Sequence, residues 1–588
     1  MLIDALISDA TELIKKKSLD QAKRVLNDGL KIDSSHPKLT FLLGQVMLQK
    51  KDFEPAIRIF KSLSEQHDSI EYLNFYAQAL ECNSNHKEAL DVYLRSIKRD
   101  GEQADILFKI ACILIIDKQF DLALKFLTQA KNITELPGLY EKMGFALAQL
   151  GDYKNSYICY QKALDKDPQD KKLLCSMISL AQKDPKKNLE HIQSLVLKYH
   201  DNFLVDIESL KINHSLKLFG SKTKLNIGFV SGNFRKNPLS FNFLPVLELM
   251  NKDQFDLFFY YSKDIVDGFT RRFQKLAAKF EMVTNLDYRD IATRILTDKI
   301  DILINLDAFE DASQLEVFKL KPAPVQIAHY AATTTLGMPE IDYMLADRFV
   351  VKPGEEIFFS EKIYRFPRTY FPVVISDLAQ PVRRLPMMSK GYITFGVTSN
   401  LHRISHEMLG TWVHVLKKSP KSKLVIDAKD LSSPSCQKLI TNFFASNGIE
   451  ESRIIIKSTI DRGELLNGYN QIDIVLDTFP SSGAIGLLDA LIMGVPVITV
   501  ESDRWSGRML SSLLRSIGCS ELIAANTEEY IDKACSLTHD RQRLEDYRLN
   551  LRTKIENSPQ SINNYVKTFE GVLHDIWQRV AKQYKSES

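Results

Sequence analysis

The sequence predicts a protein of two parts, a helical-repeat solenoid followed by two doubly wound α/β domains, which makes its fold class α + α/β. Small and large apolar residues recur every 33 or 34 positions over the first 170 residues. From Leu225 onward, short apolar runs alternate with helical patterns, as in parallel sheets, and this alternation starts again after residue 386. A chain of 588 residues is also too long for one hydrophobic core.

The repeats rest on three series of residues with one period. Two series hold small residues, where paired helices approach closely, and the third holds large apolar residues four positions further on. They are Gly44, Ala77, Ala111 and Gly144; then Ala22, Ala56, Ala89, Ala123 and Ser156; then Leu26, Phe60, Tyr93, Leu127 and Tyr160. The pattern resembles tetratricopeptide repeats, and about four and a half of them fit into residues 1–170. We expect a concave surface that holds an acceptor protein; the alternative is a role in folding or dimerisation only.

Residues 171–222 read as a helical linker, out of register with the repeats. Residues 223–385 and 386–588 read as two Rossmann-like domains, each with a predicted parallel sheet. Strands are expected at 225–230, 255–261, 301–306, 325–330 and 363–366, and then at 392–397, 423–426, 453–456, 472–476 and 496–500. The helical segment from Thr527 to Gln583 is expected to pack back across the first of these domains.

Composition excludes several classes of protein. The net charge is only +3, so no nucleic-acid partner is expected. The seven cysteines are scattered without a CxxC pair, which argues against zinc and against a disulfide framework. No membrane span and no signal peptide are predicted, so a cytoplasmic location is expected. No metal and no cofactor are predicted, and the sequence is compatible with a homo-oligomer.

Loops at the carboxyl ends of the predicted strands carry the candidate site. The run 472–476 is followed by a small-residue turn, Pro480 to Gly483, and by a helix. Ligands bind at such positions in open α/β sheets because backbone N–H groups at the helix start face the crevice. A purely steric reason for the small residues is the alternative. Other loops carry Asn400 with Arg403, and Arg462, so a phosphate-containing ligand is expected.

Four stretches resemble the O-linked N-acetylglucosamine transferase (SPINDLY-like) family, and the resemblance extends over nearly the whole chain. They are IGFVSGNFRKNP (227–238), the stretch 318–347 with KPAPVQ, TSNLHRISHEMLGTWVHVLKKSP (398–420) and the stretch 473–500 with LDTFP. Members join tetratricopeptide repeats to a two-lobed (GT-B) nucleotide-sugar transferase. The resemblance implies metal-independent, inverting transfer from a UDP-sugar, such as UDP-GlcNAc, to Ser or Thr of proteins.

The resemblance also implies a donor site. Arg403 falls on the family's cation beside the diphosphate, Asn400 on its amide neighbour, Arg462 on a second cation and Asp489 on the acid that binds the ribose. The family's donor loop falls on Gly483, Ala484, Ile485 and Gly486, so its two hydroxyls are missing, although Ser482 lies just upstream.

Departures from the family pattern leave two functions open. The family's His near the acceptor falls on Asn237, and two further His positions fall on Phe309 and Leu465. An inverting transfer needs a base for the acceptor hydroxyl, and His329 is the nearest substitute in the sequence; the donor's own phosphate is another. The chain is therefore either an active protein glycosyltransferase, flagellin-type being one version, or a catalytically impaired scaffold.

Overall fold

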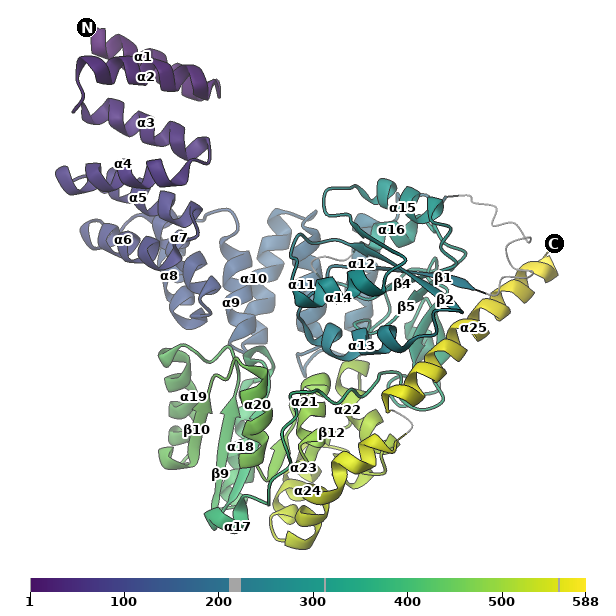
Figure 1. The fold of residues 1–588 in the computed structure, drawn as a ribbon. Coiled ribbons are helices and arrows are strands. Elements are labelled where there is room, and N and C mark those ends of the chain that lie inside the picture. The colour runs from purple at the N-terminus through teal and green to yellow at the C-terminus, as the bar shows by residue number, and fades with distance from the viewer. Residues whose placement is uncertain (1, 211–223, 311–313, 559–560, 588) are drawn as a thin grey trace. The chain divides into compact units, whose positions relative to one another are not determined.

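A computed structural model describes residues 2–210, 224–310, 314–558 and 561–587 of the chain (Figure 1). The chain divides into two compact units, Met1–Leu147 and Ala148–Ser588, which are treated separately below. None of the helices among the described residues is both long and apolar enough to cross a bilayer.

The first unit is a stack of helix pairs. Its helices are α1 (Leu2–Lys15), α2 (Leu19–Ile32), α3 (Pro37–Gln49), α4 (Phe53–Gln66), α5 (Ile70–Cys82), α6 (His86–Arg99), α7 (Ala104–Ile116), α8 (Phe120–Ile133) and most of α9 (Leu139–Gln149). The predicted repeat positions Ala56 and Phe60 are fully buried. A Cβ on Gly44 would lie 2.7 Å from the Phe60 ring, which explains the small residue there. The predicted helical repeats are confirmed.

A fourth periodic series lies in the turn inside each helix pair, and the sequence reading missed it. Lys17, Lys51, Ser84 and Lys118 all have φ between 58° and 62°, and Gly151 follows at 75°. Each sits between the two helices of its pair, where one left-handed residue reverses the chain. A non-glycine residue adopts this conformation at modest cost, so four of the five turns have no glycine that would reveal them in the sequence.

The second unit begins with three helices and continues into a first lobe. The helices are α10 (Tyr153–Lys166), α11 (Lys171–Ala181) and α12 (Leu189–Phe203). The sheet of the first lobe has the order β3-β2-β1-β4-β5-β6-β7, and all its neighbours are parallel. Its strands are β1 (Leu225–Ser231), β2 (Phe255–Tyr261), β3 (Lys279–Met282), β4 (Ile302–Asn305), β5 (Val325–Ala328), β6 (Tyr343–Ala346) and β7 (Lys362–Arg365). Its helices are α13 (Pro238–Leu249), α14 (Gly268–Leu276), α15 (Tyr288–Thr297) and α16 (Leu315–Lys319).

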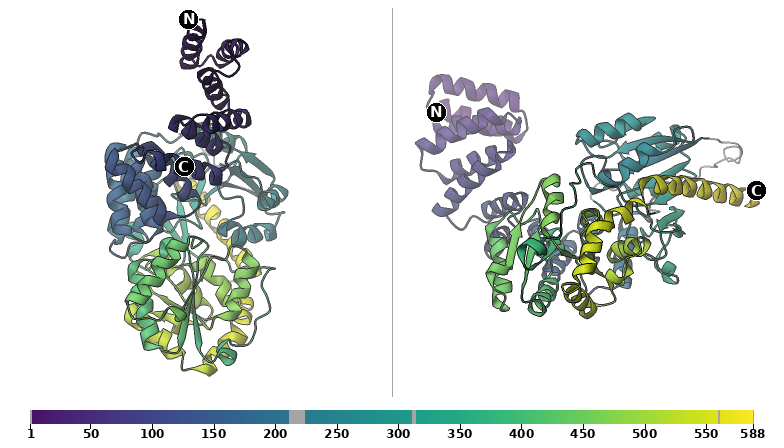
Figure 2. Two further views of the ribbon diagram at one scale, coloured as in Figure 1. Left: turned by 90° about the vertical axis from the view of Figure 1, so that its left-hand side faces the viewer. Right: turned by 60° about the horizontal axis from the view of Figure 1, so that its bottom comes forward.

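The second lobe repeats this architecture, with helices on both faces of its sheet (Figure 2). The strand order is β10-β9-β8-β11-β12-β13, again parallel throughout. Its strands are β8 (Ile393–Thr398), β9 (Ser422–Asp427), β10 (Ile454–Lys457), β11 (Ile474–Leu476), β12 (Val497–Val500) and β13 (Ile523–Ala524). Its helices are α17 (Met387–Lys390), α18 (His406–Lys418), α19 (Pro434–Ser446), α20 (Arg462–Gly468), α21 (Ala484–Ile492), α22 (Trp505–Ser516), α23 (Thr527–Leu537) and α24 (Arg541–Glu556).

The last helix returns to the first lobe. Helix α25 (Ile562–Glu587) packs on α13, where Phe569 meets Phe243 with ring centroids 5.6 Å apart. Asp575 accepts a hydrogen bond from the hydroxyl of Tyr364 at 2.6 Å. The prediction that the chain's end packs on the first lobe is correct for this helix, whereas α23 and α24 belong to the second lobe.

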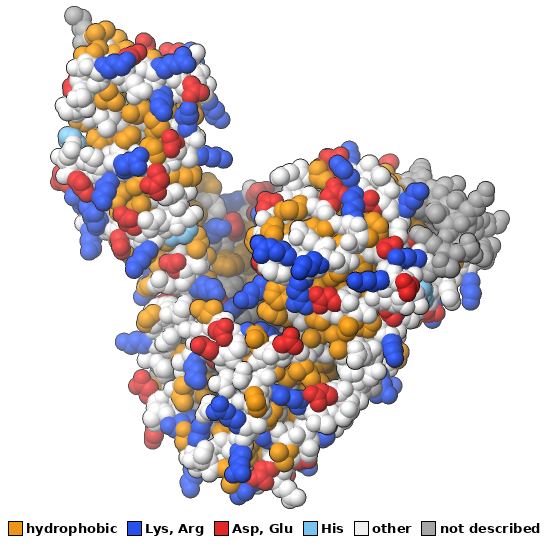
Figure 3. Space-filling view, in the orientation of Figure 1, with side chains coloured by type: hydrophobic (Ala, Val, Ile, Leu, Met, Phe, Trp, Pro, Cys, Tyr) orange, Lys and Arg blue, Asp and Glu red, His pale blue; other side chains and the backbone are white. Residues whose placement is uncertain are grey.

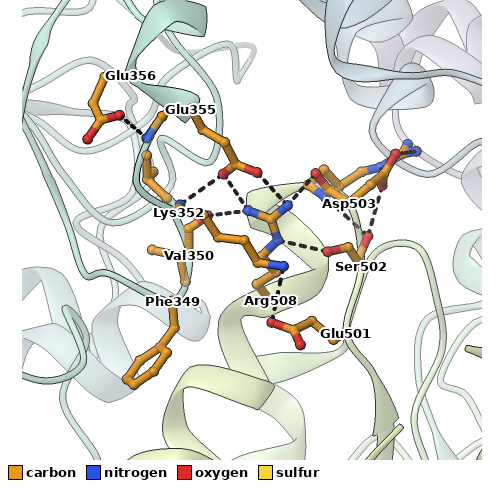
Figure 4. A network of polar contacts seen from close by, with 12 residues as sticks. Phe349, Val350, Lys352, Glu355, Glu356, Glu501, Ser502, Asp503 and Arg508 are labelled. Carbon is orange, nitrogen blue, oxygen red and sulfur yellow. Dashed lines mark hydrogen bonds and ion pairs between the residues drawn. The ribbon is translucent and has the colours of Figure 1, made fainter. Parts of the chain in front are cut away.

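A buried polar network joins the two lobes (Figure 4). Arg508 on α22 forms a two-point ion pair with Glu355 of the first lobe, with N–O distances of 2.5 and 2.8 Å. The same guanidinium donates to the carbonyls of Ser502 and Asp503 at 2.7 and 2.6 Å. Arg508 is 3% exposed and Glu355 is 21% exposed, so water screens this pair only in part.

Candidate functional site

The second sheet reverses its strand order between β8 and β11. The loops after these two neighbouring strands therefore open from the same edge, at the position where open parallel sheets bind ligands. The first loop carries Asn400 and Arg403, and the second leads through Ser482 and Gly483 into α21. The topology thus brings together residues that lie about 80 positions apart in the chain.

Asp477 organises the second loop. Its carboxylate accepts hydrogen bonds from the backbone N–H groups of Thr478 and Gly483 at 2.8 and 3.0 Å. It also accepts from the hydroxyls of Ser482 and Thr499 at 2.6 and 2.7 Å. Burial raises the pKa of Asp477, and these hydrogen bonds oppose the shift. The carboxylate thus fixes the turn that precedes α21.

The start of α21 offers backbone donors. Gly483 is its N-cap residue, followed by Ala484 and Ile485, so the first N–H groups of the helix lack helical acceptors. The Ser482 hydroxyl donates its proton to Asp477. The loop therefore presents main-chain N–H groups, which suit a phosphate and need no side-chain hydroxyl.

Arg403 is the main cation of this edge. It ends the short 3-10 helix Leu401–Arg403, whose N-cap is Asn400, and its own N–H donates to the Asn400 carbonyl at 3.0 Å. Its Nε atom is buried without a hydrogen-bond partner. Burial lowers the pKa of the guanidinium, while Asp477 and Tyr153 oppose that shift. Within the described ranges, no carboxylate forms an ion pair with Arg403, which leaves its charge available to an anion.

Arg462 and Asp489 form an ion pair beside this loop. The Arg462 guanidinium donates to the Asp489 carboxylate at 2.8 Å and stacks over the Phe241 ring of the first lobe, 4.6 Å from its centroid. Burial raises the pKa of Asp489 to about 6, against the effect of Arg462. These two predicted donor-binding residues thus hold each other, and Arg462 also bridges the lobes.

An open cavity of about 660 Å³ lies next to this pair, at the junction of the lobes. Lys236 of the first lobe and Lys457, Asp461 and Glu464 of the second line it. Ile460, also in its wall, is 83% exposed. Lys and Arg side chains gather where the lobes meet on the face shown in Figure 3. A charged cavity with one exposed apolar side chain suits a polar ligand that also has an apolar part.

Asn237, at the position of the family His, has a structural task in the first lobe. Its Oδ1 caps α13 by accepting from the Ser240 N–H at 2.9 Å, and its Nδ2 donates to the Asn233 side chain at 3.0 Å. The Asn233 side chain in turn donates to Glu310 at 2.6 Å and to Asp307 at 3.0 Å. Desolvation of the Glu310 carboxyl raises the pKa of this group to about 7, and the negative charge of Asp307 contributes to the rise.

His329 does not lie in the cleft. It is 1% exposed and packs between Phe366 and Phe569, with ring centroids 6.2 and 5.7 Å away. Burial lowers its pKa to about 3, so the ring stays neutral at physiological pH. The prediction of His329 as a substitute base is therefore corrected, since the ring is enclosed in the aromatic core and cannot reach an acceptor hydroxyl. Phe309 is likewise buried, 5.2 Å from the Tyr199 ring.

Sequence reasoning missed Glu310, Lys183 and Tyr153. The Tyr153 hydroxyl at the start of α10 donates to the His402 carbonyl at 2.8 Å. Burial, followed by the charge of Arg403, lowers the pKa of Lys183 to about 7. Neither Lys183 nor Tyr153 follows a strand, so strand-end reasoning gave no reason to look at them.

Two successive parallel-sheet lobes, the second with a cationic loop at its strand-order reversal, have the architecture of a GT-B-type transferase fold. The chain belongs to glycosyl transferase family 41, whose model matches residues 200–388 and 372–569. Tetratricopeptide repeat models match residues 13–79 and 137–170.

Comparison with individual proteins agrees with this assignment. The chain is 27% identical over 361 residues to a probable UDP-N-acetylglucosamine–peptide N-acetylglucosaminyltransferase SPINDLY of Solanum lycopersicum, covering 60% of this chain and 39% of that protein. It is 28% identical over 374 residues to the probable transferase SEC of Arabidopsis thaliana, covering 62% and 38%. The aligned part thus spans about two fifths of these relatives. A mutant Thermobaculum terrenum O-GlcNAc transferase has the same fold, with a TM-score of 0.78 at 24% identity, covering 88% of this chain and 98% of that one.

Proposed function

We propose that the protein is an O-glycosyltransferase that moves a sugar from a nucleotide-sugar, UDP-GlcNAc or another activated sugar, to Ser or Thr of an acceptor protein. The observation that carries this proposal is Arg403, a half-buried guanidinium beside the start of α21 in a family 41 lobe, whose Nε atom is buried without a hydrogen-bond partner. A partly buried charge without a partner is unfavourable, and a bound diphosphate would compensate it.

The reaction in this proposal is a single displacement. The bond between the sugar's C1 and the diphosphate oxygen breaks, and its electron pair stays on the diphosphate. The acceptor hydroxyl oxygen forms a bond to C1 from the opposite face, which inverts C1, and the hydroxyl proton is released. Arg403 and the N–H groups that begin α21 would hold the leaving diphosphate as its charge grows.

Glu310 would take the proton in this scheme. It is connected through Asn233 to Asn237, the position at which the family places a His. A pKa of about 7 suits a base that works near neutrality. Glu310 is exposed to solvent, so an acceptor hydroxyl can reach it. A phosphate oxygen of the donor is the other acceptor for this proton.

The repeats would hold the acceptor protein, because stacked helix pairs form extended surfaces that bind polypeptides. A catalytically impaired scaffold is the second candidate function. The replaced family residues Asn237 and Phe309 favour it, because Asn237 caps a helix and Phe309 is buried.

Transfer itself separates these two functions. The full chain is incubated with an array of Ser- and Thr-containing peptides and separate UDP-, GDP- and CMP-sugars, and mass spectrometry records added sugar. If the protein is an active transferase, the peptides gain the mass of a sugar with one class of donor, and Arg403→Ala adds no sugar. Absence of transfer with every donor, while proteins still bind the repeats, would establish the scaffold instead.

A further inference from the structure

We propose that Lys183, on the loop between α11 and α12, is the second cation of the diphosphate site and acts there with Arg403. This inference rests on the proposed function, because it assigns a new member to the same site. Lys183 lies 220 positions before Arg403 in the chain and outside both α/β lobes.

The loop that carries Lys183 is held in place on both sides of this residue. Arg504, which is 3% exposed, donates to the carbonyls of Ala181 and Asp184 at 3.0 and 3.1 Å and to that of Lys187 at 2.5 Å. From the first lobe, the Thr333 hydroxyl donates to the Gln182 side chain at 2.7 Å. Three carbonyls of the loop accept hydrogen bonds from one guanidinium, which leaves the loop little freedom. Lys183 is thus presented from a fixed backbone.

The neighbouring helices place this loop against the segment that carries Arg403. Tyr153 donates to the His402 carbonyl at 2.8 Å, and a Cβ on Gly151 would lie 2.4 Å from the Ile404 carbonyl oxygen. Lys186, three residues beyond Lys183, is 4.0 Å from Glu407. The backbone on either side of Arg403 is therefore packed against the start of α10, which contacts α11, and the loop that carries Lys183 reaches the same segment through Lys186.

Several like charges act on one another in this corner, which favours an anion between them. Burial, followed by Arg403, lowers the pKa of Lys183 to about 7. Burial is the main cause that lowers the pKa of His402, and the positive charges of Lys183, Arg403 and Lys429 lower it further. The hydrogen-bond partner of the Lys183 amine is the Ser179 hydroxyl at 2.9 Å, and no carboxylate in the described part of the chain pairs with it. Asp477, whose charge acts on Arg403, accepts hydrogen bonds from its own loop and from Thr499.

Two adjacent cations match the charge of a diphosphate. A nucleotide-sugar carries about one negative charge on each phosphate, and departure of the sugar adds a further charge to the terminal one. A second cation therefore binds the leaving group more tightly than the donor, which assists the chemical step. Arg403 supplies a planar fork of donors and Lys183 a point charge.

Calorimetry on the full chain tests this assignment with UDP, GDP and inorganic pyrophosphate as the probes. Lys183→Met should weaken binding of the diphosphate that the wild type prefers by about 10- to 100-fold. Lys186→Met removes the same charge from an exposed position on the same loop and should change affinity less than twofold. If Lys183→Met does not fold, Lys183→Gln replaces it. Affinity equal to the wild type in either variant would overturn the inference.

Proton uptake on binding distinguishes direct contact between Lys183 and the anion from a purely structural role of Lys183. A bound anion stabilises the charged amine, so at pH 7.5 binding should take up part of a proton, measured from the heats in buffers of different protonation enthalpy. Lys183→Met should lose this uptake, and Lys183→Arg should lose it while keeping affinity within about threefold. Unchanged uptake in Lys183→Met would contradict the assignment.

The outcomes distinguish this inference from the proposed function. Diphosphate binding that depends on Lys183, in a protein that transfers no sugar, would overturn only the proposed function. Transfer that does not depend on Lys183 would overturn only the inference. A wild type that binds none of the three probes would overturn both.

Discussion

Burial lowers the pKa of the Arg403 guanidinium and the nearby Asp477 carboxylate opposes this shift, yet the two residues form no ion pair. The four hydrogen bonds that Asp477 accepts come from its own loop and from Thr499. The acid of the site therefore shapes the turn before α21, and the charge of Arg403 is left uncompensated. A site with this arrangement attracts an anion.

Removal of Arg403 should leave the fold intact. Because the guanidinium is half-buried and its Nε has no partner, Arg403→Ala removes an unfavourable charge together with some packing, and the two effects oppose each other. We expect a change in unfolding free energy of less than about 1 kcal/mol, measured by thermal melting and circular dichroism. A loss several times larger would show that Arg403 has a structural partner.

Glu310 should set the acid side of the pH–rate profile. Below its pKa of about 7 the carboxyl is protonated and cannot accept the hydroxyl proton, so the rate of transfer should rise with pH and level off above about 7. Glu310→Gln should remove this rise and lower kcat by about 100- to 10,000-fold. A variant with the wild-type rate and profile would assign the proton to the donor phosphate.

Removal of one partner of the ion pair between the lobes should destabilise the protein more than removal of both. Arg508→Met leaves Glu355 without its partner and should destabilise the second unit by about 3–5 kcal/mol. The double variant Arg508→Met/Glu355→Met should lose less unfolding free energy than Arg508→Met alone, because no uncompensated charge remains. Chemical denaturation measures both, and equal losses in the two variants would show that charge pairing is not the cause.

Gly507 should be required by the turn before α21. A Cβ there would lie 1.9 Å from the Pro480 carbonyl oxygen and 2.3 Å from the Ser502 Cβ, so Gly507→Ala must displace the loop. We expect a lower melting temperature and at least tenfold weaker nucleotide-sugar binding. The control is Gly410→Ala in α18, where a Cβ meets nothing within 4 Å and helix propensity predicts a gain of about 0.5–1 kcal/mol. Equal behaviour of the two variants would rule out the steric argument.

The repeats should act on the acceptor and not on the donor. Deletion of residues 2–147 removes the first compact unit and retains the hydrogen bond from the Tyr153 hydroxyl to the His402 carbonyl. The truncated chain should bind nucleotide-sugar like the full chain, and its modification of a protein acceptor should fall at least tenfold. If the truncated chain modifies the protein acceptor as fast as the full chain does, the repeats do not hold the acceptor.

Much of the fold could be predicted because its determinants are local. Ala56 and Phe60 recur with the repeat period because each helix pair needs a small residue at the crossing and a large one beside it. Two of the strands that were missed offer little to detect. Lys279–Met282 is an edge strand without a buried residue, and Ile523–Ala524 is an edge strand of two residues. Such strands carry too few buried positions to give a pattern. Tyr343–Ala346 was also missed, although the predicted strand Val325–Ala328 has the same length.

The site could be predicted only where it follows the strands. Asn400, Arg403 and Gly483 come together because parallel strands carry their loops to one edge, which holds for any strand order that makes β8 and β11 neighbours. Lys183 reaches Arg403 through tertiary packing of a helical segment, for which the sequence has no local signal. His329 had the right chemistry, but its position in the aromatic core depends on α25, more than 230 residues later.

Binding of nucleotide-sugars to the full chain and to Arg403→Ala tests the central claim most directly. A panel of UDP-, GDP- and CMP-sugars is titrated into both proteins by calorimetry. The account predicts that one nucleotide class binds the wild type and that Arg403→Ala, still folded, loses at least about tenfold in affinity. Absence of binding across the panel, or equal binding by both proteins, would contradict a donor site at Arg403.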